Sequence, residues 1–406
     1  MKDCFIVDGI RTPIGKLGGS LASIRTDDLA ALALNALMQR NSNIDSEFID
    51  DVILGCANQA GEDNRNVARM ALLLAGISWK VPGETVNRLC ASGLAAVISG
   101  YRAISMDQGD LIIAGGVESM TRAPYVISKS SAPFGRDAEL ADSSFGWRFI
   151  NPKMKALYGT DSMGETAENL ASRYKLSREV QDAFAFASQQ KAFQSQNSGR
   201  FDKEIQPVEL KLKNELSTIF SKDEFLKPST SLEGLAKLKP AFKKTEEGGS
   251  VTPGNASGLN DGAAALLLAS ESAIKKHSLK PMARILAAAV CGVEPNIMGI
   301  GPVPASLLAL KRANLTLENM DIIELNEAFA AQVLACLQEW KIEFNDPRLN
   351  PNGGAISLGH PLGMSGARIL YSAALELELR KQKYALVTMC IGVGQGYACV
   401  IENCNI

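Results

Sequence analysis

The sequence predicts an α/β protein whose covered sheet is built twice, and three features of the chain support this prediction. Short buried strands alternate with apolar or amphipathic helices over residues 1–121. A similar order of elements returns over residues 273–406, although the two parts share few identical residues. Between these two parts the sequence pattern changes to charged, amphipathic helical stretches. We therefore expect three units, which are residues 1–121 with 251–272, an inserted mainly helical segment at 122–250, and residues 273–406.

The first unit is expected to alternate strands and helices from its start. Cys4 to Asp8 is a short apolar run typical of a buried strand, and a helix through Leu29–Leu37 is expected to be capped at Thr26 or Asp27. The further expected elements are, in order, a strand at Ile49–Gly55, a polar loop at Ala57–Asn66, a helix at Val67–Ala75, an extended run at Glu84–Asn87, a helix from Cys90 to about Ile104, and a strand at Leu111–Gly116 that continues to Met120.

Residues 122–250 carry helical periodicity without further buried strands. The best helical patterns are Thr166–Tyr174 and Arg178–Gln194, and they are followed by polar loops such as Lys227–Ser231. An insertion of this kind over an α/β core is a plausible substrate lid.

The remaining residues predict a second copy of the first unit. A Gly- and Ser-containing stretch, 251–258, leads into a helix-and-strand stretch that ends at Ala269. The expected counterparts of the first unit are the strand Ala283–Val290, the strand Met320–Asn326, the helix after Pro361, which parallels the Cys90 helix, and the strand Ala385–Gln395.

Composition and charge exclude several classes of protein. Of the 406 residues 46% are hydrophobic and 21% are charged, and the net charge of −2 favours neither nucleic acid nor an anionic membrane as a partner. The sequence contains no apolar run of about 18 residues, and neither end resembles a targeting signal. Eight cysteines at irregular spacing, without a CxxC pair, indicate reduced thiols. We expect a soluble, cytoplasmic protein.

Cys90 is the first candidate for catalysis. It follows an extended run and opens an apolar helix, where the helix dipole is expected to lower the thiol pKa towards neutrality and to favour the nucleophilic thiolate. The alternative is a buried cysteine that acts as a small hydrophobe. Two further stretches favour the catalytic interpretation.

Histidine is the side chain best suited to accept a thiol proton at neutral pH, and the chain has only two. His277 lies at a polar helix end, where a solvated or capping role is expected. His360 lies among glycines and prolines that fix an irregular loop before a helix, which is typical of a ligand site, although a structural histidine in a tight turn stays an alternative.

Two more stretches place reactive groups at strand ends. Cys390 precedes a glycine-rich loop whose backbone N–H groups, including that of Gly392, are suited to an oxyanion site. The glycines do not match a phosphate-binding GxGxxG before a helix. Asn326 and Glu327 follow another expected strand, where either could also be an ordinary helix cap. The two cysteines and the histidine lack the spacing of zinc ligands, so no metal site is predicted.

Together these stretches resemble the thiolase family over essentially the full chain. The matching stretches are Arg88-Leu89-Cys90-Ala91-Ser92-Gly93, Gly254-Asn255-Ala256-Ser257-Gly258, Asn326-Glu327-Ala328-Phe329, Gly359-His360-Pro361 and Cys390-Ile391-Gly392. The resemblance implies a duplicated, five-layered αβαβα core, a loop domain over the active site, and a homotetramer built as a dimer of dimers. It also implies an acyltransferase with no permanently bound cofactor, which takes CoA and acetyl-CoA as substrates.

The resemblance assigns a role to each matching residue. Cys90 is the nucleophile that becomes acylated, and His360 activates it and forms one oxyanion site with a water held by Asn326. Cys390 moves protons to and from the acetyl α-carbon and the CoA thiol, and the N–H groups of Cys90 and Gly392 form the second oxyanion site.

Substrate contacts are also implied. Ser257 should contact the pantetheine arm, Met163 and Phe329 should line the acyl pocket, and Lys227 stands where relatives often have an arginine against the adenine. Lysine neutralises phosphate but stacks less well than arginine. The residue before Met163 is not the histidine that biosynthetic members tend to carry, which favours a degradative enzyme.

Finer likeness indicates the branch of the family that cleaves 3-oxoadipyl-CoA to succinyl-CoA and acetyl-CoA in aromatic catabolism. The stretches that carry it are Cys56–Asn66, Gly146–Pro152, Met298–Pro304 and Val393. Arg65, Arg122 and Arg148 are unranked candidates for the distal carboxylate, and a structural ion pair is the default alternative for each of them. The alternatives are a thiolase for another 3-oxoacyl-CoA, from fatty-acid β-oxidation, acetoacetyl-CoA or didehydrosuberyl-CoA, and a non-catalytic protein that binds acyl-CoA.

Overall fold

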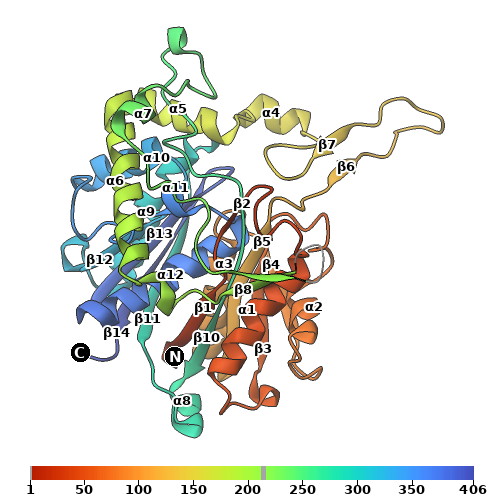
Figure 1. The fold of residues 1–406 in the computed structure, drawn as a ribbon, viewed down its shortest axis with the longest axis vertical. Helices are drawn as coiled ribbons and strands as arrows, with labels where there is room; N and C mark the ends of the chain where they lie inside the picture. Colours follow the sequence, from red (N-terminus) through yellow and green to blue (C-terminus); the bar gives the residue numbers. More distant parts are fainter. Residues whose placement is uncertain (1, 212–215) are drawn as a thin grey trace.

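A computed structural model describes residues 2–211 and 216–406, and its central feature is one large mixed sheet (Figure 1). The strand order is β12-β13-β14-β11-β1-β10-β5-β3-β4, and β2 pairs with β10. Its strands are β1 (Cys4–Arg11), β2 (Gly15–Lys16), β3 (Asp51–Gly55), β4 (Gly83–Val86), β5 (Leu111–Ser119), β10 (Asn260–Ser270), β11 (Ala283–Gly292), β12 (Ile322–Leu325), β13 (Tyr384–Ile391) and β14 (Gln395–Asn403).

The pairing pattern confirms the predicted duplication. In the first half β1 pairs antiparallel with β10, β10 antiparallel with β5, and β5 parallel with β3. In the second half β11 pairs with β14, β14 with β13, and β13 with β12 in the same three orientations. The halves join where β1 and β11 pair over two residues, Phe5 with Arg284 and Ile6 with Ala283. β11, β12 and β13 are therefore the counterparts of β1, β3 and β5, as expected.

Helices cover both outer faces of the half-sheets and fill the space between them, which gives the five layers. The outer helices are α1 (Thr26–Arg40) and α2 (Val67–Leu74) on the first half, and α9 (Pro302–Ala313) and α10 (Ala330–Trp340) on the second. The central helices are α3 (Ser92–Ser105) and α12 (Leu362–Arg380). Their apolar side chains form one buried cluster with Ile112 and Leu268 from the first half and Val387 and Ile401 from the second.

Close backbone contact at four glycines positions the starts of the two central helices. An added Cβ at Gly116 would lie 1.9 Å from the carbonyl oxygen of Gly363, and one at Gly93 would lie 2.4 Å from the same oxygen. A Cβ at Gly55 would meet the backbone of Ser92 at 2.2 Å. Since only glycine permits such an approach, these positions set how closely α3 and α12 lie against β3 and β5.

The insertion contains helices and two small hairpins. Its helices are α4 (Pro152–Tyr158), α5 (Met163–Arg173), α6 (Arg178–Asn197) and α7 (Leu232–Ala236), and its paired strands are β6 (Tyr125–Ile127) with β7 (Leu140–Asp142) and β8 (Val208–Lys211) with β9 (Ser217–Phe220). The β6–β7 hairpin projects away from the rest of the molecule (Figure 1). The two remaining helices, α8 (Glu271–His277) and α11 (Ala355–Leu358), belong to the second part of the chain.

Buried ion pairs fix part of the insertion to the core. Arg11, at the end of β1, donates to Glu204 at 2.8 Å and to both oxygens of Asp223 at 2.7 and 2.8 Å. Arg200 joins Glu204 to Glu376 of α12. Arg200, Glu204 and Asp223 of the insertion are in this way tied to β1 and α12.

Four local expectations are corrected by the structure. The α1 N-cap is Arg25, so Thr26 and Asp27 are the first two helical residues rather than caps. Cys90 lies two residues before α3 instead of inside it. Residues 260–270 form one fully buried strand, with no helix before it in the 251–269 stretch. The insertion does contain a strand with buried side chains, since Val208 and Leu210 of β8 join the cluster beneath α1.

No helix within the described residues is long and apolar enough to cross a membrane.

Candidate active site

A cavity of about 610 Å³ brings together residues from both halves and the insertion. Six of the predicted site residues line it, namely Cys90, Met163, Ser257, Phe329, His360 and Gly392. Cys390 and Asn326 are buried directly behind this lining, in contact with its members. Motifs up to about 300 residues apart in sequence thus converge on one site.

Cys90 lies in a tight turn that precedes α3. Leu89 has a left-handed backbone with φ of 47°, and the Ser92 hydroxyl accepts from the N–H of Arg88 and donates to the carbonyl of Leu89. The N–H groups of Gly392 and of Cys90 itself are directed at the sulfur, but burial outweighs them and raises the thiol pKa to about 11. The expected lowering of this pKa towards neutrality is therefore wrong, because the helix begins only at Ser92 and the thiol loses more hydration than the N–H groups restore.

His360 is held in one tautomer by its neighbours. Its Nδ1 lies 2.6 Å from the hydroxyl of Ser365, and that hydroxyl donates its own hydrogen to the carbonyl of Pro361 at 2.8 Å. Nδ1 must then be the protonated nitrogen, which leaves Nε2 as an acceptor that faces Nδ2 of Asn326 at 3.3 Å. Burial, with a smaller effect from Arg368, lowers the pKa of His360 to about 3, so the ring is neutral at physiological pH.

Asn326 immediately follows β12 and is buried. Its N–H donates to the carbonyl of Thr388 on β13, which fixes the residue beside the strand that carries Cys390. Its side-chain Oδ1 is buried and finds no hydrogen-bond partner among the described residues. A buried amide oxygen of this kind is costly unless a ligand or a water satisfies it.

Cys390 is fully buried near the end of β13. Burial raises its pKa well above the ordinary value, and the nearby Cys90 thiol adds to the effect. The two thiols are therefore close, and both are protonated at neutral pH. After the strand, Val393 and Gly394 turn the chain with φ of 64° and 85°, so that Gly392 and Val393 reach the cavity.

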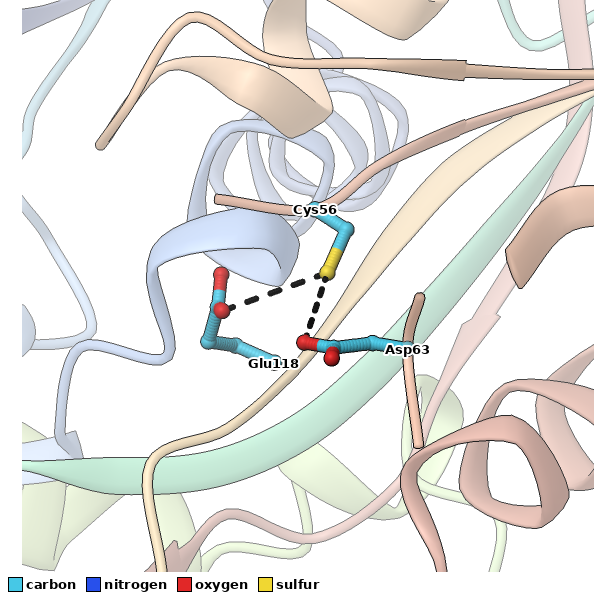
Figure 2. A group of neighbouring side chains, drawn as sticks. All are labelled: Cys56, Asp63 and Glu118. Atoms are coloured by element: carbon cyan, nitrogen blue, oxygen red, sulfur yellow. Dashed lines mark hydrogen bonds between the residues drawn. The ribbon is translucent and has the colours of Figure 1, made fainter. Parts of the chain in front are cut away.

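One cluster of titratable side chains was missed by the sequence reasoning. Cys56, Asp63 and Glu118 are all buried, and the Cys56 thiol donates to Asp63 at 3.4 Å and lies 4.0 Å from Glu118 (Figure 2). A carboxylate at the end of the buried run Leu111–Met120 was the signal that could have revealed it. Burial is the main cause that raises the pKa of Glu118 to about 7.

This cluster orders the backbone around the cavity. The oxygens of Glu118 accept from the N–H groups of Ala57, Asn58 and Gly363, the last at 2.8 Å. Both oxygens of Asp63 likewise accept N–H groups, from Gln59 and Gly61. Because N–H donors already occupy these oxygens, the three side chains fit a structural anchor better than a metal site.

The predicted substrate-contacting residues fall into two places. Met163 begins α5 behind the N-cap Ser162, and Phe329 meets Phe242 edge-on at 6.3 Å, so these side chains form the apolar wall. Ser257 lines the same cavity, and its N–H donates to the carbonyl of Ala328. Lys227 lies outside, exposed in a neighbouring hollow with Lys16, and the two hollows share Leu259.

The three candidate arginines occupy different surroundings. Arg122 is paired with Glu62 at 2.6 Å and also donates to the carbonyl of Ala22. Arg65 is exposed and does not line the cavity. Arg148 is partly buried and does line it. His277 ends α8, as expected, with its ring packed on Phe48 at 5.1 Å.

Comparison with known proteins agrees with this site. Residues 4–272 match the family described as "Thiolase, N-terminal domain", and residues 279–403 match "Thiolase, C-terminal domain". The 3-oxoadipyl-CoA/3-oxo-5,6-dehydrosuberyl-CoA thiolase of Escherichia coli (strain K12) is 58% identical over 403 residues, which cover 99% of this chain and 100% of that protein. A beta-ketoadipyl-CoA thiolase of Acinetobacter baylyi is 55% identical over 403 residues, with the same coverage.

A solved structure shows the same fold. Human mitochondrial 3-ketoacyl-CoA thiolase in complex with CoA superposes with a TM-score of 0.91 at 41% identity, covering 99% of this chain and 98% of that one. Two family matches that together span nearly the whole chain, relatives of 55–58% identity at full length and the convergence of both thiols with a neutral histidine lead to one conclusion. The chain is a member of the thiolase family of acyltransferases.

Proposed function

We propose that this thiolase cleaves 3-oxoadipyl-CoA with CoA to give succinyl-CoA and acetyl-CoA. The observation that carries the proposal is full-length identity of 55–58% to relatives that are named for this substrate. The catalytic groups on the cavity supply the chemistry, and the solved relative with bound CoA supports CoA as the second substrate. CoA enters and leaves as a substrate and is not a resident cofactor.

In the proposed first step, Cys90 attacks the 3-oxo carbon of the substrate. His360 Nε2, the unprotonated ring nitrogen that faces Nδ2 of Asn326, takes the thiol proton as the carbon–sulfur bond forms. The N–H groups of Cys90 and Gly392, which already face the sulfur, are suited to stabilise the oxyanion that develops beside it.

In the second step the bond between C2 and C3 breaks and leaves a succinyl thioester on Cys90. The enolate oxygen of the departing acetyl-CoA is placed near His360 in this proposal. A water that donates to the unsatisfied Oδ1 of Asn326 can donate its second hydrogen to the enolate oxygen. Cys390 donates the proton that C2 requires. The Cys390 thiolate then takes the proton of incoming CoA, whose sulfur attacks the thioester, and His360 returns its proton to Cys90.

Two cysteine variants test these roles. Cys90→Ser should form no acyl-enzyme, because a hydroxyl is a poorer nucleophile and leaving group than a thiol. Cys390→Ala should still be acylated at Cys90 by succinyl-CoA, from which CoA can leave as a thiolate, but it should lose carbon–carbon cleavage of 3-oxoadipyl-CoA, since C2 lacks its proton donor. Mass spectrometry of the intact protein and acetyl-CoA release would be followed together. Normal cleavage by Cys390→Ala would remove this residue from the mechanism.

The substrate is tested by a direct comparison. Purified protein and CoA are mixed with 3-oxoadipyl-CoA, acetoacetyl-CoA or 3-oxohexanoyl-CoA, and kcat/KM is measured for each. A preference of about tenfold or more for the dicarboxylate supports the proposal, since it corresponds to about 1.4 kcal/mol of transition-state discrimination. Better cleavage of the plain chains would discard 3-oxoadipyl-CoA. No cleavage of any would favour a non-catalytic protein.

A second dicarboxylic substrate deserves the same assay. The relative with 58% identity is also named for 3-oxo-5,6-dehydrosuberyl-CoA. That chain is longer but again ends in a carboxylate. Both substrates pose the same recognition problem, which is a charged group at the far end of an acyl chain in a mainly apolar cavity.

We also propose a homotetramer built from dimers. The projecting β6–β7 hairpin carries exposed large apolar side chains, namely Tyr125, Ile127, Phe134 and Leu140, and a surface of this kind favours burial against another subunit. Light scattering during gel filtration would measure the mass, and Ile127→Lys with Leu140→Lys should reduce it to that of a dimer.

We further propose that the chain is divided into three units, with residues 122–250 as the inserted unit.

A further inference from the structure

Arg148 is the only cationic side chain that lines the active-site cavity in the part of the chain that the structure describes. The single histidine there is neutral, and the single carboxylate, Glu118, is turned to N–H donors. The guanidinium of Arg148 donates once, from Nη1 to the carbonyl of Ser143 at a long 3.3 Å. No carboxylate of the described residues lies within ion-pair distance of it, whereas Arg122 is paired with Glu62.

An arginine that lines a cavity and has no carboxylate partner is suited to bind an anionic ligand. A guanidinium offers five N–H donors in a planar fork, and a carboxylate matches two of them at once. Placing a charge at the wall of a mainly apolar cavity without a counter-ion is unfavourable, because it loses hydration that no partner restores. A ligand carboxylate would remove this deficit when it binds.

Hydrogen bonds locate Arg148 on the wall that begins at the nucleophile. Asn87, three residues before Cys90, accepts from the N–H of Leu89 and donates to the carbonyl of Ala57 at 3.0 Å. The next residue, Asn58, donates to the carbonyl of Ser143 at 2.7 Å, the same oxygen to which Arg148 donates. Ala57 and Asn58 are in turn fixed by Glu118. The wall is therefore a continuous, rigid structure.

The cations suited to CoA phosphates lie elsewhere. Lys16 and Lys227 line the neighbouring exposed hollow, which meets the main cavity at Leu259, beside Ser257 and Gly258. We expect a CoA whose pantetheine arm contacts Ser257 to extend its phosphates towards this hollow. Arg148 is then left for the acyl end of the substrate.

We propose that Arg148 is the specificity-determining residue that binds the distal carboxylate of a dicarboxylic 3-oxoacyl-CoA and of the acyl-enzyme formed from it. This inference rests on the proposed function and names the recognition element within the same site. Arg65, which is exposed away from the cavity, and Arg122, which already has a carboxylate partner, do not serve this role.

The experiment compares two acyl chains of equal length in three variants. Arg148→Gln removes the charge, Arg148→Lys retains it without the planar fork, and Arg65→Gln is the matched control. The substrates are 3-oxoadipyl-CoA and 3-oxohexanoyl-CoA, which has a methyl group in place of the carboxylate. Melting temperatures and circular dichroism establish that each variant is folded.

Arg148→Gln should lower kcat/KM for 3-oxoadipyl-CoA by about 100-fold and change that for 3-oxohexanoyl-CoA by less than about threefold, a loss in the range expected for hydrogen bonds to a charged group. Arg148→Lys should lie between Arg148→Gln and the unchanged protein. Arg65→Gln should leave both substrates unaffected. Succinyl-CoA should stabilise the unchanged protein against heat more than butyryl-CoA does, and Arg148→Gln should abolish this difference.

Two failures are distinguishable. If the unchanged protein prefers 3-oxohexanoyl-CoA, the proposed substrate fails. If the unchanged protein prefers the dicarboxylate but Arg148→Gln retains that preference, or loses both substrates equally, the role of Arg148 is overturned while the proposed function stands.

Discussion

Before substrate binds, Cys90 is a protonated thiol at neutral pH. Its pKa of about 11 and the His360 pKa of about 3 describe a neutral pair rather than a preformed thiolate–imidazolium pair. In the mechanism that we propose, proton transfer from Cys90 to His360 then accompanies attack on the substrate, when the developing oxyanion meets the N–H groups of Cys90 and Gly392. The resting enzyme thereby keeps its nucleophile unreactive towards adventitious electrophiles.

The pH dependence of alkylation tests this arrangement. Because the pKa of Cys90 is raised, the thiolate fraction is small at neutral pH and grows as pH approaches 11. The rate of inactivation by iodoacetamide should therefore rise steadily from pH 6 to 10 without levelling off. Because Cys390→Ala is expected to lose cleavage, its alkylation is followed by peptide mass spectrometry, and modification of Cys90 in this variant assigns the reactive thiol. A plateau between pH 6 and 8 would indicate a preformed ion pair and contradict the prediction.

Residue types and the family resemblance predicted that Cys90, His360, Asn326 and Cys390 act together, and the structure places all four at or directly behind one cavity. The pKa of Cys90 was predicted in the wrong direction, since it depends on how deeply the turn before α3 is buried. The ranking of the three arginines was also invisible in the sequence. It depends on which of them has a partner, and the partner of Arg122 is 60 residues away.

At the scale of elements, the crossing of α12 over β3 and β5 places His360. The N–H of Gly363 is bound by Glu118, and the carbonyl of Gly363 lies against Gly116 and Gly93. These contacts set the position of the first turn of α12, and His360 lies two residues before that helix. Small residues at this helix–sheet crossing therefore set the position of His360, which we propose as the general base.

Gly116→Ala should disturb both stability and activity. The new methyl group would lie 1.9 Å from the Gly363 carbonyl oxygen, so α12 must shift, and overpacking of a core typically costs about 1–3 kcal/mol. We expect a lower urea midpoint and a kcat reduced by about tenfold or more. Gly292→Ala is the control, because its nearest neighbour would be 3.9 Å away, and it should change neither quantity appreciably.

Periodicity predicted most strands and helices and the repeated order of the two halves. It could not separate a helix from a strand within residues 251–269, because a strand buried on both faces is uniformly apolar and shows no alternation. The cap of α1 was misplaced for a related reason. Arg25 has extended dihedral angles but makes no side-chain cap, so the sequence gives no capping signal at this position.

At the scale of the whole molecule, five charged side chains connect β1, the insertion and α12. Arg11, Arg200, Glu204, Asp223 and Glu376 are nine-tenths or more buried. Although burial opposes ionisation of Glu204, the Arg11 and Arg200 guanidinium groups lower its pKa to about 2. The network fixes the register of three distant segments.

Removing Arg11 should be severe. Arg11→Gln leaves Glu204 and Asp223 without their main cation, and breaking a buried pair typically costs about 3–5 kcal/mol of unfolding free energy. Urea denaturation measures this loss. Lys275→Gln, which removes an exposed pair with Glu271, is the control and should have little effect.

The same variant should alter acid stability. Because the pKa of Glu204 is lowered, its carboxylate stabilises the fold at pH values above its ordinary pKa of 4.5. This contribution is lost as the pH falls from 4.5 towards 2. Arg11→Gln should therefore show a weaker fall in stability over this interval than the unchanged protein. Equal slopes would contradict the assignment of the lowered pKa to Arg11.

The place of β10 in the sheet has a consequence for biosynthesis. β10 lies between β1 and β5, yet the chain makes β1 and β5 before residue 120 and β10 only at residues 260–270. At translation rates of about 5–20 residues per second, β5 waits roughly 8–30 s and β1 roughly 13–50 s for their shared partner. The nascent chain must hold two apolar strand edges open during this interval, which is a demand that chaperones meet. The half of the sheet beside Cys90 can close only after the whole insertion has been translated.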